Sequence, residues 1–249
     1  MIAEGRARKM GTRDKRAAVH LGWLGAALAM AALSFGLAWP GKRRTGAGMK
    51  EPGSSVALPA PDRDSGYALE RALAERRSER EFADAALRLA EISQLLWAAQ
   101  GLTHGYRSAP SAGALYPLEV YVAVGRVEQL APGVYRYQSS GHRLARIALH
   151  DQRAELARAA YGQSWLGEAP AILVLAGVER RTTVKYGERG VRYVHMEAGH
   201  AAQNVLLQAV ALGLGATPVG AFDDHRVAAA LGLQAGERPL YLIPVGRPR

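Results

Sequence analysis

The sequence predicts an α+β fold, in which helices flank a mixed β-sheet around one central apolar helix. Residues 170–178 form a continuous apolar run that is typical of a buried strand. Residues 191–212 are apolar on most sides of a helix, which indicates a helix at the centre of the protein. Strands and helices are mixed without a regular βαβ rhythm, and this favours α+β over a doubly wound sheet.

The other elements follow from local patterns. Apolar residues recur at helical spacing in two early segments, and Gly101 closes the second. Alternating apolar residues predict a strand, and two such runs around a Ser-Gly turn predict a hairpin. The predicted helices are residues 67–76, 87–100, 151–161 and 224–231; the predicted strands are 118–124, 133–137, 142–148, 216–222 and 240–245.

The net charge of +10 is concentrated at the N-terminus. Residues 1–50 carry ten bases and two acids, whereas residues 51–249 carry 22 bases and 20 acids. The rest of the chain is therefore nearly neutral, and no basic stripe with interleaved aromatic residues is visible in it. We expect no nucleic-acid partner.

The N-terminal charge surrounds an uncharged stretch of 19 residues, 21–39, which approaches the length that spans a bilayer. We expect a basic segment at 1–19, a hydrophobic segment at 20–39, a linker rich in Pro, Gly and Ser at 40–57, and one domain at 58–249, with order beginning near residues 56–59. Three interpretations of the hydrophobic segment stay open. It is a signal anchor that tethers the protein to a membrane, a cleaved signal peptide of an exported protein, or an extension that is disordered or, if translation starts at Met49 in the cytoplasm, not translated.

The absence of cysteine excludes disulfides, thiolate metal sites and cysteine nucleophiles, so redox chemistry would need a bound cofactor. His195 and His200 are five residues apart and cannot form an i, i+4 metal pair on a helix. No metal site is predicted.

Three arginines within five residues, Arg76, Arg77 and Arg80, are interrupted by Ser78 at the end of a predicted helix. Converging guanidinium groups are the donors that a phosphate dianion needs, and Ser78 adds a neutral donor. The alternative is a solvated charged face, because acidic residues are interleaved with the arginines.

Two glycine-containing stretches could also approach a ligand. Residues 108–117 combine small residues with Pro and Gly, which lets backbone approach a flat ligand closely, although a surface loop has the same composition. Ser111 does not lie in a G-x-S-x-G elbow. The glycines of residues 213–220 follow a helix and open a strand, which is the reverse of a dinucleotide-binding fingerprint.

Taken together, these stretches resemble the nitroreductase-like FMN proteins. The resemblance covers about residues 58–249 and rests on five motifs in order. They are R-R-S-x-R-x-F at 76–82, P-S-A-G-x-x-Y-P at 110–117, E-A-G-H-A-A-Q-N at 197–204, G-A-F-D at 220–223 and P-V-G-R-P at 244–248. The Tyr116-Pro117 and Ala198-Gly199-His200 variants look most like the SagB-like branch, which includes thiazoline and oxazoline dehydrogenases.

The resemblance implies a nitroreductase-like dimer with FMN bound across its interface. It places Arg76, Arg77 and Ser78 at the phosphate and ribityl chain, Arg80 at the pyrimidine end, and Arg247 again at the phosphate. It places Pro110, Ser111, Ala112 and Gly113 over the isoalloxazine from the partner subunit, and Gly220 and Ala221 near flavin N5. The apolar helix at 191–212 independently predicts a homodimer, because it is apolar on too many sides for a monomer surface.

Lys185 and Tyr186 match a pair that is implicated in catalysis in azoline dehydrogenases. A desolvated lysine can act as a base, but a solvent-facing loop lysine beside a packed tyrosine is equally compatible with the sequence. Three functions remain in competition: a reductase that passes hydride from NAD(P)H to a small organic acceptor, a dehydrogenase of an azoline or peptide substrate that uses oxygen, and a membrane-tethered FMN-binding subunit without turnover of its own.

Overall fold

The computed structural model of the chain describes residues 53–249. The expected basic segment, the hydrophobic segment and most of the expected linker lie outside these residues. Within the described part, no helix is both long and apolar enough to cross a membrane.

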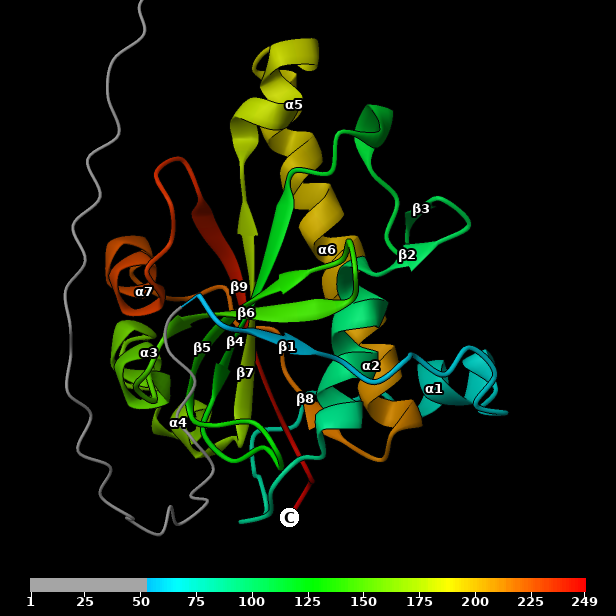
Figure 1. Ribbon diagram of the computed structural model, residues 1–249, viewed down its shortest axis with the longest axis vertical. Helices are drawn as coiled ribbons and strands as arrows, with labels where there is room; N and C mark the ends of the chain where they lie inside the picture. Colours follow the sequence, from blue (N-terminus) through cyan, green and yellow to red (C-terminus); the bar gives the residue numbers. More distant parts are fainter. Residues whose placement is uncertain (1–52) are drawn as a thin grey trace, which may run out of the picture. The chain divides into compact units, whose positions relative to one another are not determined.

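A seven-stranded sheet forms the middle layer, with the strand order β1-β6-β5-β4-β7-β9-β8 (Figure 1). A separate two-stranded hairpin stands beside it. The strands of the sheet are β1 (Ser55–Ala57), β4 (Leu118–Val124), β5 (Gly133–Gln138), β6 (Arg143–Ala148), β7 (Ala171–Gly177), β8 (Gly215–Ala216) and β9 (Arg238–Gly246), and the hairpin is β2 (Leu102–Thr103) with β3 (Tyr106–Arg107).

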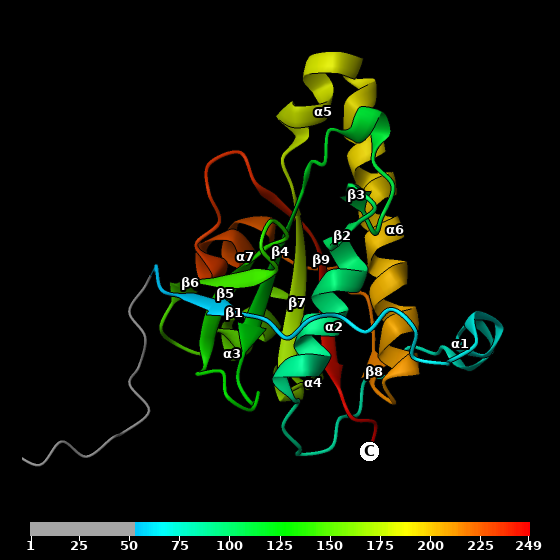
Figure 2. The same cartoon turned by 45° about the vertical axis from the view of Figure 1, so that its right-hand side comes forward.

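Helices cover both faces of the sheet, as the two views in Figures 1 and 2 show. One face packs against α2 (Leu89–Gln100) and α6 (Arg189–Ala211), the other against α3 (Arg153–Ala159), α4 (Ser164–Glu168) and α7 (Asp224–Leu231). Every residue of β7 is buried, because its side chains alternate between the two cores. This explains the continuous apolar run at 170–178.

The strongest sequence patterns predict their elements closely. β4 has the predicted bounds 118–124, α7 has the predicted bounds 224–231, and the hairpin of β5 and β6 is confirmed. α6 is 23 residues long and packs against one face of the sheet, at the place of the predicted helix 191–212 (Figure 2). α1 (Leu69–Glu75) is two residues shorter at its N-terminal end than the predicted helix at 67–76.

The sheet is antiparallel at every ladder of the described chain, rather than mixed as expected. β7 and β8, which α6 connects, do run in the same direction, since each is antiparallel to β9. They are not neighbours, because β9 lies between them. β9 therefore separates β7 from β8, so these two strands form no parallel ladder.

Three further expectations need correction. The predicted strand at 216–222 is only the two residues of β8 plus a single bridge from Val219 to Leu242, because Pro218 has no N–H to donate to a ladder. Two helices were not predicted: α4, and α5 (Glu179–Tyr186), which replaces the loop expected around Lys185. Residues 55–57, expected as linker, form β1 and pair with the outer edge of β6.

Candidate functional site

A pocket of about 490 Å³ lies where the end of α1, the end of α6 and the end of the chain meet. Arg76 and Arg77 line it, together with Gly213, Gly215 and Pro248. The Arg77 side chain is 77% exposed, and its only ion pair among the described residues is a long one, with 3.4 Å between Nε and Glu79 Oε2. The guanidinium group of Arg77 is thus largely free to bind an anion.

The two acids that line the same pocket, Glu75 and Glu79, also accept hydrogen bonds from other groups. Glu75 accepts hydrogen bonds from the Tyr67 hydroxyl at 2.5 Å and from Arg71 Nε at 2.7 Å. Glu79 accepts hydrogen bonds from the backbone N–H groups of Arg80 at 3.2 Å and Glu81 at 3.4 Å. The two carboxylates therefore do not neutralise the arginines fully, and the pocket suits a phosphate group.

Backbone contacts with the segment after α6 hold the arginine-rich segment. Ser78 forms a parallel bridge with Ala216, and Glu79 N–H donates to the Ala216 carbonyl at 3.2 Å. A Cβ atom on Gly215 would overlap the Glu79 side chain, so only glycine allows this approach. The glycines of residues 213–220 do not fit a dinucleotide-binding fingerprint. One of them, Gly215, instead allows the arginine-rich segment to lie next to the end of α6.

Arg247 lies near this region but its side chain is held by another group. Its Nη2 donates to Oε1 of Glu91 at 2.9 Å, and Glu91 also binds Arg88. Burial pushes the pKa of Glu91 up, but hydrogen bonds from Arg88 and Arg247 outweigh it, and the pKa lies below its usual value. Pro248 lines the pocket, and Arg247 does not.

Arg80 and Ala221, both expected near the flavin ring system, are connected through the start of α4. Arg80 Cζ lies 5.7 Å from the centroid of the Trp165 ring. Gln163 Nε2 donates to the Ala221 carbonyl at 3.4 Å. Gly220 and Tyr241 both line a second pocket of about 260 Å³, and a Cβ atom on Gly220 would make only an ordinary contact with Tyr241, at 3.9 Å.

The loop at 110–113 packs directly against Lys185 and Tyr186, which are far from it in the sequence. Gly113 has a φ of +61°, and a Cβ atom there would lie 2.7 Å from the Tyr186 hydroxyl oxygen and 2.9 Å from Lys185 Nζ. Tyr186 packs edge-on against Tyr193 with ring centroids 5.2 Å apart. Two groups of residues that the resemblance singles out are therefore neighbours within a single chain.

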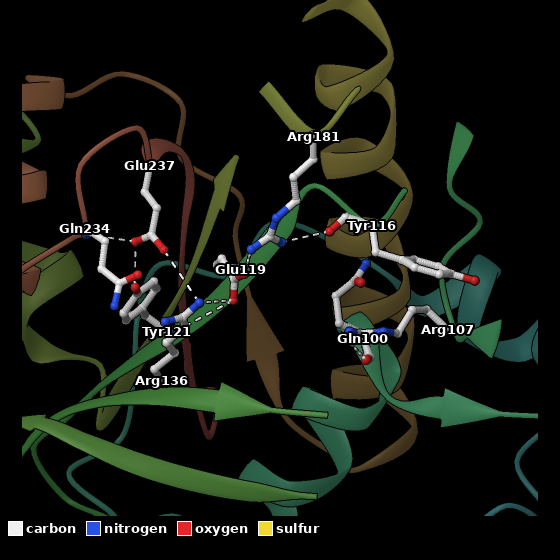
Figure 3. Close-up of polar contacts among 9 residues, drawn as sticks. All are labelled: Gln100, Arg107, Tyr116, Glu119, Tyr121, Arg136, Arg181, Gln234 and Glu237. Atoms are coloured by element: carbon white, nitrogen blue, oxygen red, sulfur yellow. Dashed lines mark hydrogen bonds and ion pairs between the residues drawn. The ribbon is translucent and has the colours of Figure 1, made fainter. Parts of the chain in front are cut away.

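A network of charged residues fixes the end of this loop (Figure 3). Arg181 Nη1 donates to the Tyr116 carbonyl at 3.0 Å, and its Nη2 reaches Glu119 Oε1 at 2.5 Å. Glu119 also pairs with Arg136 at 2.9 Å. Through Arg181, α5 is thus anchored to the loop and to strands β4 and β5, and α5 also carries Lys185.

Glu197 is the residue of this region whose role was not predicted. It is only 3% exposed, and Ala112 N–H donates to its Oε1 at 2.8 Å. Burial raises the pKa of Glu197. An acid at a position where the apolar pattern of a helix calls for a core residue is the sequence signal that could have identified it.

A single chain does not bring the 110–113 loop together with the pocket lined by Arg76 and Arg77, which we call the arginine pocket. The loop at 110–113 is bound to Glu197 in the N-terminal half of α6, whereas the arginine pocket lies beside Gly213 after its C-terminal end. At 1.5 Å per residue, these positions are roughly 20 Å apart along the helix. Figures 1 and 2 show α5 and the C-terminus at opposite ends of the described structure.

Comparisons with known proteins agree on one family. A sequence profile described as the nitroreductase family matches residues 73–247. Two proteins named as putative nitroreductases are similar to the chain. MJ1384 of Methanocaldococcus jannaschii is 46% identical over 197 residues, which cover 78% of this chain and 98% of that protein. A solved structure from Ralstonia eutropha JMP134 is 32% identical with a TM-score of 0.70, over 78% of this chain and 90% of that one.

A second group of similar proteins processes a microcin. The microcin B17-processing protein McbC of Escherichia coli is 31% identical over 134 residues, which cover 51% of this chain and 48% of McbC. The E. coli microcin synthetase McbBCD complex with truncated pro-MccB17 contains a chain that is 29% identical, with a TM-score of 0.63 and a coverage of 70% of both chains.

The NADPH:FMN oxidoreductase of Vibrio harveyi, at 20% identity and a TM-score of 0.54, shares the fold over 72% of this chain and 68% of that one.

Proposed function

The chain belongs to the nitroreductase family, and from that premise we propose that it is an FMN-dependent oxidoreductase that moves hydride between NAD(P)H and a small organic acceptor. One observation carries the proposal. Arg76 and Arg77 line a pocket of about 490 Å³, and the neighbouring acids are already engaged. A phosphate group is the ligand that exposed fork-shaped donors recognise best.

The residues of the chain suit the remaining parts of FMN as well. Ser78 would bind next to the phosphate, and Arg80 with Trp165 would bind the ring system, since Arg80 is exposed and stacks on that indole. The backbone at Gly220 and Ala221 is exposed and would be open to the flavin. Bound flavin supplies the hydride chemistry, while these residues bind it, orient it and adjust its electrostatics.

We further propose that the site is completed by a second copy of the chain. Pro110, Ser111, Ala112 and Gly113 lie roughly 20 Å from the arginine pocket along α6, so the loop would cover the flavin of a partner subunit. Leu69, Leu73, Leu102 and Tyr106 expose large apolar surfaces near α1 and the β2–β3 hairpin, and a partner would bury them.

A second candidate function is supported by the position of Lys185 and Tyr186. Their functional atoms meet the loop at Gly113, so both side chains would reach the flavin that this loop covers. The McbC relative and the McbBCD structure favour this candidate, in which the protein oxidises an azoline or related peptide substrate and oxygen accepts the electrons. Lys185 would then act as the base and Tyr186 would hold it in place.

Purification of the full-length protein tests the first proposal. We expect a yellow protein whose released flavin is FMN and not FAD, and which oxidises NADPH faster when menadione or nitrofurazone is added. Oxygen-dependent oxidation of a thiazoline peptide without NAD(P)H turnover would favour the second candidate. A colourless protein that takes up no added FMN would contradict both.

A further inference from the structure

The turn at 111–116 has an unusual backbone. Three of its six residues have positive φ: Gly113 at 61°, Ala114 at 54° and Tyr116 at 47°. For residues other than glycine, this conformation is strained. The turn therefore needs contacts from outside itself to keep this shape.

Glu197 provides such a contact from α6. Its Oε1 accepts the N–H of Ala112 at 2.8 Å, and the neighbouring Ser111 side chain acts to lower the pKa of the same carboxylate. Ser111 Oγ in turn accepts the N–H of Tyr116 at 2.8 Å. The buried carboxylate thus holds the turn directly at Ala112, and Ser111, which neighbours both Ala112 and the carboxylate, holds Tyr116.

Glu197 is exceptional among the buried residues of α6. The others are all Gly, Ala, Val or Leu. An apolar residue would pack there without the desolvation that a carboxylate suffers. Core stability therefore does not explain Glu197, whereas its contacts with the strained turn do.

We propose that Glu197 is a positioning residue that holds the 111–116 turn in the shape that presents Ala112 and Gly113 to the flavin of the partner subunit. The proposal rests on the proposed function as far as the flavin is concerned. The contact between Glu197 and the turn is a property of the subunit itself and can be measured without any flavin. Failure of the two statements can therefore be distinguished.

Hydrogen exchange of the full-length protein, stripped of flavin, tests the restraint on the turn. In Glu197→Ala, we expect the amides of Ala112 and Tyr116 to exchange about tenfold faster or more, because both lose their acceptor or its support. Glu197→Gln keeps an amide oxygen for Ala112 and should restore slow exchange at that position. Ser111→Ala, a milder change, should accelerate Tyr116 alone.

Glu91→Ala is the matched control. Glu91 is also a buried carboxylate, bonded to Arg88 at 2.8 Å and Arg247 at 2.9 Å, but it does not contact the turn. Unchanged exchange at Ala112 and Tyr116 in Glu197→Ala would overturn the proposal. Faster exchange spread evenly over the chain, as expected for Glu91→Ala, would do the same, since it would show a purely structural role.

The flavin-bound protein tests the second half of the proposal. Glu197→Ala should weaken FMN binding about tenfold and shift the visible spectrum of the bound flavin, with both effects reversed by Glu197→Gln. If exchange in the turn changes and the FMN affinity does not, the turn does not present its residues to flavin. If no variant binds FMN, the proposed function fails while the exchange result still decides the role of Glu197.

Discussion

Arg247 and the buried Glu91 are joined by a hydrogen bond of 2.9 Å, which ties the end of β9 to the first turn of α2. Arg88 binds the same carboxylate at 2.8 Å. Two cations thus share one acid that is 1% exposed. This arrangement predicts how stability depends on pH.

Glu91→Gln should lower the free energy of unfolding at pH 7 by about 1.5–3 kcal/mol, the usual contribution of a hydrogen bond to a charged group. The pKa of Glu91 lies below its unfolded value of 4.5, so its contribution is present above pH 4.5 and is lost as the pH falls through the folded value. Urea unfolding at pH 7, 5 and 3.5 should show the difference between variant and wild type shrinking. Glu70→Gln, an exposed acid, is the control. A difference that is constant with pH would contradict this origin.

Arg77→Ala should weaken FMN binding roughly ten- to a hundredfold, because one charge-assisted donor to a phosphate is worth on the order of 1.5–3 kcal/mol. The loss should shrink for riboflavin, which has no phosphate. Arg80→Ala should weaken both ligands alike and lower the reduction potential, since Arg80 would stabilise the reduced ring. Titration of both variants with both ligands checks this. Equal effects of Arg77→Ala on FMN and riboflavin would remove Arg77 from the phosphate.

The sequence predicts the fold well where a pattern depends only on neighbours along the chain. β4 and α7 are predicted to the residue because their apolar spacing and the Asp223 cap are local signals. The helix α5 was missed because its residues are mostly polar and its order depends on contacts such as Arg181 with Tyr116 and Glu119. The predicted strand at 216–222 is longer than β8, because the effect of Pro218 depends on which strand pairs beside it.

The candidate site divides in the same way. Arg76, Arg77 and the 110–113 loop could be identified from motifs, since each motif is contiguous. The contact between Gly113 and Tyr186 and the link from Ala112 to Glu197 join residues more than 70 positions apart, so no local pattern predicts them. The resemblance gives these residues roles one at a time, and the structure shows which of them are neighbours.

Gly113→Ala should disturb the site more than its backbone cost explains. Alanine at a φ near +60° costs roughly 1–2 kcal/mol, and here its Cβ would also displace the Tyr186 hydroxyl and Lys185 Nζ. Gly232→Ala is the matched control, because Gly232 has a φ of +64° and a Cβ there makes only an ordinary contact at 3.6 Å. We expect similar losses of stability but reduced turnover only in Gly113→Ala. Equal turnover in both variants would show that the Gly113 contact is not needed.

Removal of residues 1–48 should leave flavin binding intact and make the protein fully soluble. The excess positive charge and the uncharged stretch both lie in this part of the sequence, whereas Arg76, Arg77 and the 110–113 loop lie well after it. Membrane fractionation of cells that express the full-length and shortened chains, with flavin content measured in each, checks the prediction. Loss of flavin from the shortened protein would show that residues 1–48 are needed for flavin binding.

Two defective chains should restore one working site when they are combined in a dimer. An Arg76→Ala/Arg77→Ala chain lacks the phosphate donors, and a Gly113→Val chain lacks a loop that fits against Tyr186. If the loop of one subunit serves the flavin of the other, each homodimer has only damaged sites. A heterodimer has one site with both defects and one site with neither, because the two sites of a twofold dimer exchange the same elements.

Co-expression with two different affinity tags and purification through both yields the heterodimer alone. Its flavin content and turnover should reach about half of the wild-type values, one intact site in two. Each homodimer, purified in the same way with both tags on the same variant, is the control and should have little of either. If the loop instead served its own subunit, every site in the heterodimer would carry one defect. Activity no higher than that of the homodimers would therefore show that the site is not shared between subunits.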